Sequence, residues 1–285
     1  MKSILLSFDI EEFDLPTEVG AEISREDMFS IAGEGTRRIL RTVNEAGART
    51  TFFVTAAFAL EFPDLVREMK SSGHEIASHG YSHTTFEPAD LKRSRETLEE
   101  ITGTPVRGFR MARLAKVGKQ DILDAGYDYE SSLNPVWLPG RYSNFTAPLK
   151  PFREACGLWQ MPVSALPVVR FPLFWLSFKN LPMPLYLTLA KAAMSATGFF
   201  NMYSHPWEYH EHAAEAQWKI PGISFIFSES KPLDSRFCIT AFSACGSRSV
   251  PVACPAPYKR AIIDNTPLPV PMSRTSIPGF TFSFI

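Results

Sequence analysis

Residues that could bind a metal ion occur in two short segments of this 285-residue chain. Asp9 and Glu11 end an apolar run, and the two-residue period of a strand places both carboxylates on one face with Ser7. His79 and His83 follow another apolar run, and their spacing lets both imidazoles reach one ion if the backbone turns helically between them. One carboxylate and two neutral imidazoles can bind a divalent ion and leave positions open for water and a substrate carbonyl. This set of residues predicts metal-assisted hydrolysis.

Two residues later in the chain could complete such a reaction. Arg110 follows Gly-Phe in an apolar segment, and His205 follows the apolar run 199–204. A carboxylate that does not bind the ion can take a proton from the attacking water, while a separate histidine protonates the leaving amine. Asp9 and His205 fit these two roles.

Each of these signals also has an ordinary structural interpretation. The first carboxylates could form a solvated loop cluster with Glu12 and Asp14, and one histidine of the pair could cap a loop while the other is exposed. Arg110 could be a surface charge and His205 a packed loop residue. The catalytic interpretation is favoured because all of these groups fall at the carboxyl ends of predicted parallel strands, where barrel and open-sheet enzymes assemble their sites.

The elements that must position these residues alternate between strand and helix from residue 3 to about residue 133, which indicates βα units and a parallel sheet. A barrel and a doubly wound sheet both fit, and residues 134–178, rich in Pro and aromatic side chains, are expected to form long loops. The expected strands are 3–10, 49–55, 74–80, 106–112, 127–133, 158–164 and 199–206, and the expected helices are 35–47, 63–73, 88–103 and 119–126.

Composition restricts the class of protein. Hydrophobic residues make up 45% and charged residues 21%, which is ordinary for a folded globular chain. A net charge of -1 argues against a nucleic-acid partner, and four cysteines without CxxC spacing fit a reducing compartment. The N-terminus lacks the apolar core of a signal peptide, so we expect a cytoplasmic protein.

The apolar stretch 166–200 is interrupted by Arg170, Lys179 and Lys191, so we expect no transmembrane segment. It is expected to pack on the core as a wall or loop. The alternative is a peripheral contact with the inner membrane surface or with a lipid-linked substrate.

The chain changes character near residue 228, where prolines become frequent and no amphipathic period remains. We therefore expect one domain over residues 1–227. Residues 228–285 are expected to be an irregular Pro-rich tail, either a divergent appendage, a disordered segment or the product of a shifted reading frame.

Five motifs in order resemble those of the polysaccharide deacetylases, carbohydrate esterase family four: SFDIEEFD, SHGYSH, GFRMAR, GYDYESS and YSHPWE. The resemblance covers roughly residues 3–210. It implies an α/β fold, a distorted (β/α) barrel of about seven parallel strands, and a bound divalent metal ion, zinc by default. It also implies removal of acetyl groups from N-acetylated sugars of a polysaccharide or its precursor, including a lipid-linked sugar, in cell-envelope or exopolysaccharide synthesis.

The same resemblance assigns roles to individual residues. It implies that Glu130 orients His205. The other implied roles are Asp9 as the base, Glu11, His79 and His83 as the metal ligands, Arg110 as the residue that holds the base, and His205 as the acid.

The sequence departs from the family pattern at two motifs. The first reads Asp9-Ile10-Glu11 instead of Asp-Asp, which leaves Glu12 as a rival ligand, and Met111-Ala112-Arg113 replaces the usual Pro-Pro-Tyr. The first variant also occurs in relatives that open cyclic amides, and Arg113 could meet an anionic substrate. A cyclic-amide hydrolase and a non-catalytic glycan-binding barrel are therefore the alternatives.

Overall fold

The computed structural model describes residues 3–18, 20–138 and 141–210. The expected tail 228–285 and the end of the expected first domain, 211–227, lie outside these residues. The expected domain boundary therefore stays a prediction.

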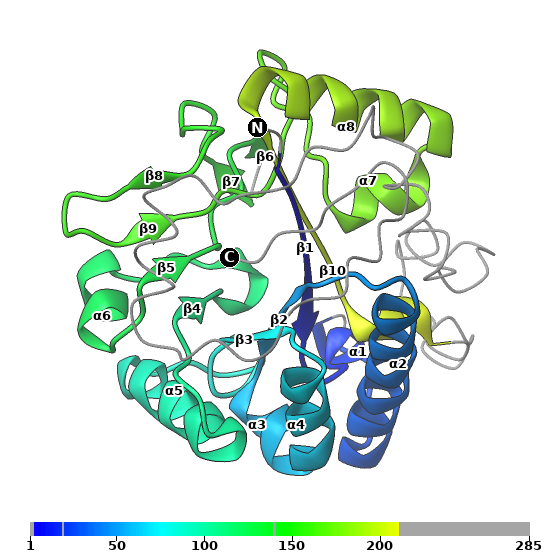
Figure 1. Cartoon of the computed structure of the whole chain (residues 1–285), viewed down its shortest axis with the longest axis vertical. Helices are drawn as coiled ribbons and strands as arrows, with labels where there is room; N and C mark the ends of the chain where they lie inside the picture. The colour runs from blue at the N-terminus through cyan, green and yellow to red at the C-terminus, as the bar shows by residue number, and fades with distance from the viewer. Residues whose placement is uncertain (1–2, 19, 139–140, 211–285) are drawn as a thin grey trace.

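The described residues form one curled eight-stranded sheet with the order β10-β1-β2-β3-β4-β5-β9-β8 (Figure 1). The strands from β10 to β9 in this order run parallel to their neighbours, and β8 is antiparallel to β9. This agrees with the expected seven parallel strands. The bounds are β1 Ser3–Ile10, β2 Thr51–Val54, β3 Glu75–Ser78, β4 Gly108–Phe109, β5 Tyr129–Glu130, β8 Phe152–Arg153, β9 Trp159–Gln160 and β10 Phe199–Ser204.

The curled sheet is closed by a loop rather than by a strand pair. Beyond β9, the backbone N–H of Ser164 donates to the carbonyl oxygen of Asn201 on β10 (3.0 Å), and the Asn201 N–H donates to the Ser164 hydroxyl (2.8 Å). The Asn201 side-chain amide also donates to the carbonyl of Pro162 (3.0 Å). The expected distorted (β/α) barrel is thus confirmed, and the doubly wound sheet is wrong.

Helices follow the strands and cover the outer face of the barrel. Ser24 caps α2 by accepting the N–H of Asp27 (3.0 Å), and Gly103 ends α5 in the left-handed conformation that glycine adopts without strain. The bounds are α1 Leu15–Glu18, α2 Arg25–Glu45, α3 Ala56–Glu61, α4 Pro63–Ser71, α5 Pro88–Thr102 and α6 Lys119–Asp124, with 3₁₀ turns η1 Ala112–Leu114 and η2 Pro206–Tyr209.

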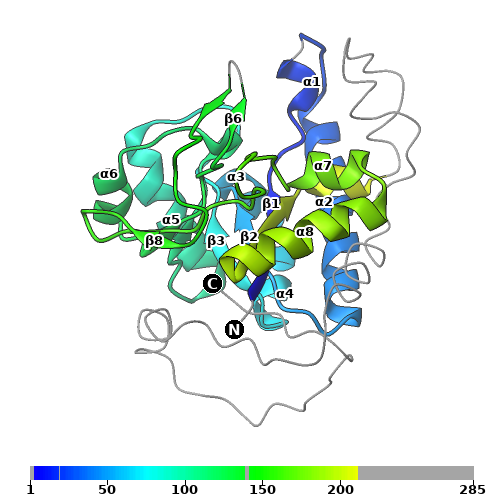
Figure 2. The same ribbon diagram turned by 90° about the horizontal axis from the view of Figure 1, so that it is seen from above.

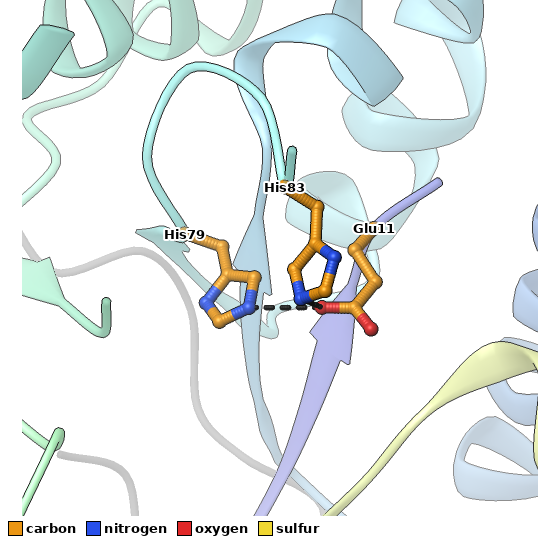
Figure 3. A group of neighbouring side chains, drawn as sticks. All are labelled: Glu11, His79 and His83. Atoms are coloured by element: carbon orange, nitrogen blue, oxygen red, sulfur yellow. Dashed lines mark hydrogen bonds and ion pairs between the residues drawn. The ribbon is translucent and has the colours of Figure 1, made fainter. Parts of the chain in front are cut away.

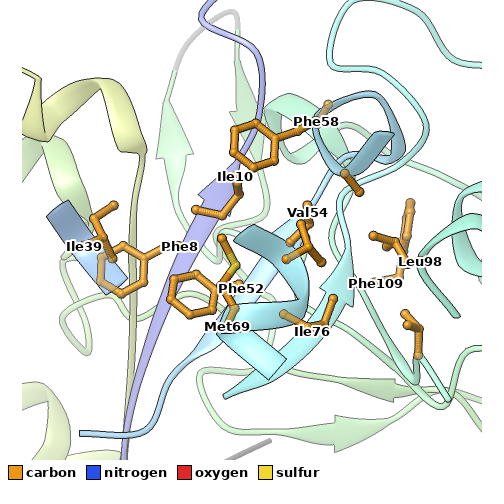
Figure 4. Packing of buried hydrophobic residues seen from close by; sticks show 14 of the residues in the cluster. Phe8, Ile10, Ile39, Phe52, Val54, Phe58, Met69, Ile76, Leu98 and Phe109 are labelled. Carbon is orange, nitrogen blue, oxygen red and sulfur yellow. The ribbon is translucent and has the colours of Figure 1, made fainter. Parts of the chain in front are cut away.

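The main core lies between the first strands and these helices. Phe8, Ile10, Phe52, Val54 and Ile76 leave the sheet on its outer face and pack together there (Figure 4). Because side chains alternate along a strand, the residues between them point into the barrel. The apolar residues of β1 thereby direct its polar residues toward the barrel interior.

Residues 166–200, expected to pack as a wall or loop, contain two helices, α7 Trp175–Asn180 and α8 Met183–Thr197. Phe178, Tyr186 and Met194 of these helices pack against Met202 of β10 in a second apolar cluster. No helix within the described residues is long and apolar enough to cross a bilayer.

A separate antiparallel pair lies within the expected loop region: β6 Trp137–Leu138 and β7 Tyr142–Ser143. In Figure 2 this hairpin and helix α1, which follows β1, project on the same side of the sheet. That side is the one where the parallel strands end.

Candidate active site

A buried ion pair joins β1 to the end of β4. The Arg110 guanidinium is 0% exposed, and its Nη1 donates to Asp9 Oδ1 (2.5 Å) and to the hydroxyl of Ser7 (3.0 Å). Its Nε and Nη2 donate to the backbone carbonyl and hydroxyl of Ser131 (3.1 and 2.9 Å), and the ring of Phe53 lies 4.0 Å from its Cζ. The guanidinium is held on every side, so the Asp9 carboxylate has one fixed position inside the barrel.

Beside this pair, Glu11, His79 and His83 each offer a ligand atom, and these atoms lie within 4.8 Å of one another. Figure 3 shows the two imidazole rings and the carboxylate converging from β1 and from the loop after β3. His79 Nε2 lies 3.0 Å and His83 Nε2 lies 3.2 Å from the same oxygen, Glu11 Oε2. All three side chains are buried.

The opposite nitrogen of each ring is fixed by an acceptor. His79 Nδ1 lies 2.9 Å from the carbonyl oxygen of Arg110, and His83 Nδ1 lies 2.7 Å from Asp14 Oδ1. Each Nδ1 therefore carries the proton, which leaves each Nε2 lone pair facing the Glu11 carboxylate. Acceptor atoms this close together need a proton or a cation between them, so the geometry fits a divalent ion.

Without a bound ion, the pKa values of Glu11 and His83 also show that positive charge is favoured between these side chains. Burial would raise the pKa of Glu11, but His83, His205 and His79 lower it to about 2. Burial would lower the pKa of His83, but Glu11 and Asp14 raise it to about 9. A bound cation would replace the extra proton on the histidines.

The spacing of His79 and His83 predicts a helical turn between them, but the chain there is not helical. Gly80 has φ +86, a left-handed conformation that favours glycine, and its carbonyl accepts the N–H of Ala56 (3.0 Å) at the start of α3. This turn brings the two rings to a centroid distance of 6.0 Å. The convergence therefore depends on the glycine turn and not on a helix face.

Neither Glu12 nor Asp14 belongs to a solvated cluster. Glu12 accepts the hydroxyl of Thr55 (2.7 Å), away from the three converging side chains, and Asp14 supports His83. Both carboxylates are buried, as are Asp9 and Glu11. The interpretation as an exposed loop cluster is wrong because each carboxylate has its own partner.

His205 lies at the end of β10, and its orientation comes from a different carboxylate than expected. His205 Nδ1 lies 2.8 Å from Glu208 Oε1, the same oxygen that accepts its backbone N–H (2.7 Å). The ring stacks on Trp207 with centroids 4.9 Å apart. Glu130 instead contacts the ammonium group of Lys119. The expectation that Glu130 orients His205 is therefore wrong, since Glu208 occupies that position in the same 3₁₀ turn.

The environment of His205 favours its protonated form. Burial alone would lower the pKa of its imidazole, but Glu11, Glu208 and Asp9 raise it above the ordinary value. A positively charged imidazole beside the cluster of Glu11, His79 and His83 is a suitable proton donor.

Two supporting residues, Asp14 and Glu208, were not identified as such from the sequence. Glu208 carried a usable signal, because a carboxylate three residues after a histidine at a turn can cap the turn and contact the ring. Asp14 carried none, because its contact with His83 depends on how two loops meet.

Residues 2–127 match the family model described as polysaccharide deacetylase. The resemblance in the motifs is confirmed over this part of the chain. Curated relatives include a peptidoglycan-N-acetylglucosamine deacetylase of Bacillus cereus, 37% identical over 69 residues, and a chitooligosaccharide deacetylase of Sinorhizobium fredii, 32% identical over 77 residues. These matches cover 24% and 27% of this chain, and 24% and 34% of the two relatives. The chain thus matches only a minor part of their length.

Solved structures show the same fold. A Mycobacterium smegmatis protein assigned to the polysaccharide deacetylases superposes with a TM-score of 0.54 at 21% identity, over 80% of this chain and 84% of that one. PuuE allantoinase superposes with a TM-score of 0.51 at 17% identity, over 85% and 90% of the two chains. At these identities the likeness concerns the barrel alone.

Proposed function

We propose that this chain is a metal-dependent hydrolase that removes acetyl groups from N-acetylated sugars of a polysaccharide or its precursor. The observation that carries the proposal is the convergence of Glu11, His79 and His83 beside the buried Asp9–Arg110 pair. Relatives named as deacetylases of peptidoglycan and of chitooligosaccharides support an N-acetylated glycan as the substrate. A cell-envelope glycan, an exopolysaccharide or a lipid-linked precursor would each supply such a sugar.

Glu11, His79 and His83 would hold the ion, and zinc is the proposed metal because two imidazoles and one carboxylate are a common zinc ligand set. A divalent ion bound there supplies Lewis-acid activation of the amide carbonyl and of the attacking water. Glu12, turned toward Thr55, is not proposed as a ligand.

Asp9 and His205 would move the protons. Asp9, fixed by Arg110, takes a proton from the water whose oxygen attacks the acetyl carbon. His205, oriented by Glu208 through Nδ1, donates the proton on Nε2 to the sugar nitrogen as the C–N bond breaks. Acetate and a free amine leave the site.

Acetate release from chitotetraose by the full chain, measured with and without added zinc and after chelation, tests this proposal. We expect turnover that depends on a stoichiometric ion. Ring opening of allantoin without acetate release would establish the cyclic-amide reaction instead. Glycan binding without turnover of allantoin, of chitotetraose or of an acidic N-acetylated glycan would establish a glycan-binding barrel.

A further inference from the structure

An open groove of roughly 1090 Å³ lies between the turn after β4 and the β6–β7 hairpin. One side consists of residues 113–117, which follow the motif arginine, and the other includes Trp137 and Tyr142 from the hairpin. The proposed reaction does not use any of these residues.

Arg113 connects the groove to the candidate active site. Its Nη2 donates to Asp14 Oδ2 (3.1 Å) and its Nη1 donates to the carbonyl oxygen of His83 (3.1 Å). Asp14 in turn fixes the ring of His83. Arg113 therefore links the lining of the groove to His83, both directly and through Asp14.

The lining of the groove carries more positive than negative charge. Arg113, Lys116, Lys119 and Arg141 line it against one carboxylate, Glu154. Arg113 is paired with Asp14 and Lys119 with Glu130, so the excess of positive charge over Glu154 comes from Lys116, which is exposed, and from Arg141. A concave surface with such an excess of one sign concentrates ligands of the opposite sign.

The groove also carries features suited to a sugar. Trp137 is 61% exposed, and a flat exposed indole can stack on the apolar face of a pyranose ring. Gln160, which is 1% exposed, lines the groove, and its Oε1 has no hydrogen-bond partner within the described residues. A buried amide oxygen without a partner is costly, and a sugar hydroxyl would satisfy it.

The backbone that presents Arg113 is strained. Arg113 has φ 56 and Leu114 has φ 51, so two consecutive residues with side chains adopt the left-handed conformation. Such a conformation is unfavourable for residues with side chains and persists where the surroundings enforce it, often at ligand sites. Here it places a cationic side chain between the ligand-supporting Asp14 and the groove.

We propose that this groove binds a sugar that carries a carboxylate or a phosphate group, next to the N-acetylated sugar held at the active site. The inference rests on the proposed function, because the anionic sugar is placed on the same glycan as the N-acetylated sugar that is hydrolysed. The preferred substrate is then an acidic glycan or a phosphorylated sugar precursor and not a neutral chitin-like chain.

Binding to the full, zinc-loaded chain tests the proposal independently of turnover. Calorimetric titrations compare three probes: a heparosan tetrasaccharide, which alternates glucuronate with N-acetylglucosamine; uridine diphosphate N-acetylglucosamine, which carries a pyrophosphate; and neutral chitotetraose. We expect one of the two anionic probes to bind about tenfold more tightly than chitotetraose at low salt, with the advantage shrinking as salt screens the charges. The probe that gains identifies carboxylate or phosphate as the recognised group.

Variants that lack positive charges of the groove test whether those charges bind the anionic group. The double substitution Lys116→Gln and Arg141→Gln should reduce the ratio of anionic to neutral affinity about fivefold or more, because two charge-assisted contacts are lost. Lys92→Gln is the matched control, since Lys92 is an exposed lysine of α5 outside the groove lining and should leave the ratio unchanged.

The outcomes separate the two proposals. Equal affinity for all three probes, or an anionic preference that the double variant retains, overturns the anionic subsite whether or not acetate is released. An anionic preference that the double variant loses, without acetate release from any probe, supports the subsite and overturns the deacetylase reaction.

Discussion

At the scale of single residues, the four carboxylates of the first motif have four different sets of contacts. Asp9 pairs with Arg110 and Glu12 accepts the hydroxyl of Thr55. Glu11 meets the two converging histidines, while Asp14 fixes one of them from behind. A shift of one position would exchange a proposed metal ligand for a side chain directed elsewhere, so the exact spacing of these acids matters more than their number.

Asp9→Asn tests the proposed base. An amide cannot accept the proton of the attacking water, so kcat should fall about 10² to 10⁴ fold while the metal content stays stoichiometric. The change also leaves the buried Arg110 charge without its partner, so the melting temperature should fall. Acetate release, metal analysis and thermal unfolding of the same preparation separate these effects.

Glu12→Gln is the control for Asp9→Asn, because it neutralises a buried carboxylate of the same segment that has no proposed catalytic role. It should retain turnover. Unchanged turnover in Asp9→Asn would mean that another group is the base.

Asp14→Asn tests the support behind His83. Loss of the carboxylate weakens the hold on the Nδ1 proton, so zinc affinity should fall about 10- to 100-fold. Competition with a chromophoric chelator measures the affinity directly. A zinc affinity equal to that of the unaltered chain would show that the Asp14 contact does not strengthen metal binding by His83.

Much of this site can be predicted from the sequence, and the limit lies in contacts between loops. Strand periodicity places Asp9 and Glu11 on one face, and the common position at strand ends brings His79, His83 and His205 to the same side. The partner of Nδ1 in His83 depends on how two loops meet, which periodicity does not encode, whereas Glu208 lies three residues after His205 and could have been identified.

At the scale of elements, helix α2 determines where the turn that carries His205 can lie. A Cβ added at Gly35 would approach the carbonyl oxygen of Pro206 to 2.0 Å, so helix and turn meet backbone to backbone. No side chain fits between them. The glycine therefore sets the position of η2, from which Glu208 orients His205.

Gly35→Ala should displace η2 despite the better helix propensity of alanine. We expect a loss of about 1–3 kcal/mol in the free energy of unfolding together with a lower kcat, because the turn must move away from the helix. Gly33→Ala on the same helix is the control, since its Cβ would meet the end of the Phe62 ring and not backbone. Equal behaviour of the two variants in urea unfolding and acetate release would contradict this view of the contact.

The elements differ in how clearly the sequence predicts them. β1, α4 and α5 match their expected ranges closely because their apolar periods and caps are clear. α8 was missed because it is apolar on nearly all sides and lacks the polar stripe that marks an amphipathic helix. β4 and β5 are shorter than expected, although the backbone N–H groups of Arg110 and Ser131 just after them still donate to Ser78 and Phe109 of the neighbouring strands.

At the scale of the whole molecule, the interior of the barrel contains an acid that affects stability. Glu75, at the start of β3, accepts hydroxyls from Thr51 (2.7 Å) and Tyr129 (2.9 Å). Burial raises its pKa from 4.5 to about 7, although these hydrogen bonds act in the opposite direction. The folded protein therefore holds this proton over a pH range in which the unfolded chain has released it.

Stability should accordingly fall as the pH rises from 4.5 to 7, because the unfolded state binds fewer protons than the folded state in that range. Glu75→Gln removes this dependence. Across the range, the unaltered chain should lose up to about 3 kcal/mol relative to the variant, measured by urea unfolding at several pH values. A constant difference between the two proteins would show that Glu75 ionises normally in the folded state.

The pairing of β1 with β10 also affects how this molecule forms. β1 pairs on one side with β2, which follows it after a short stretch of chain. On its other side it pairs with β10, far along the chain, where Ser3 lies opposite Phe199 and Phe8 opposite Ser204. During synthesis one edge of β1 therefore stays unpaired until nearly all the described chain has emerged, which favours slow folding and makes association with other chains easier. Glu11, His79 and His83 can meet before that event, whereas His205 arrives only with the closing strand. The proposed metal site can thus assemble first, and the proposed proton donor is added when β10 closes the described part of the barrel.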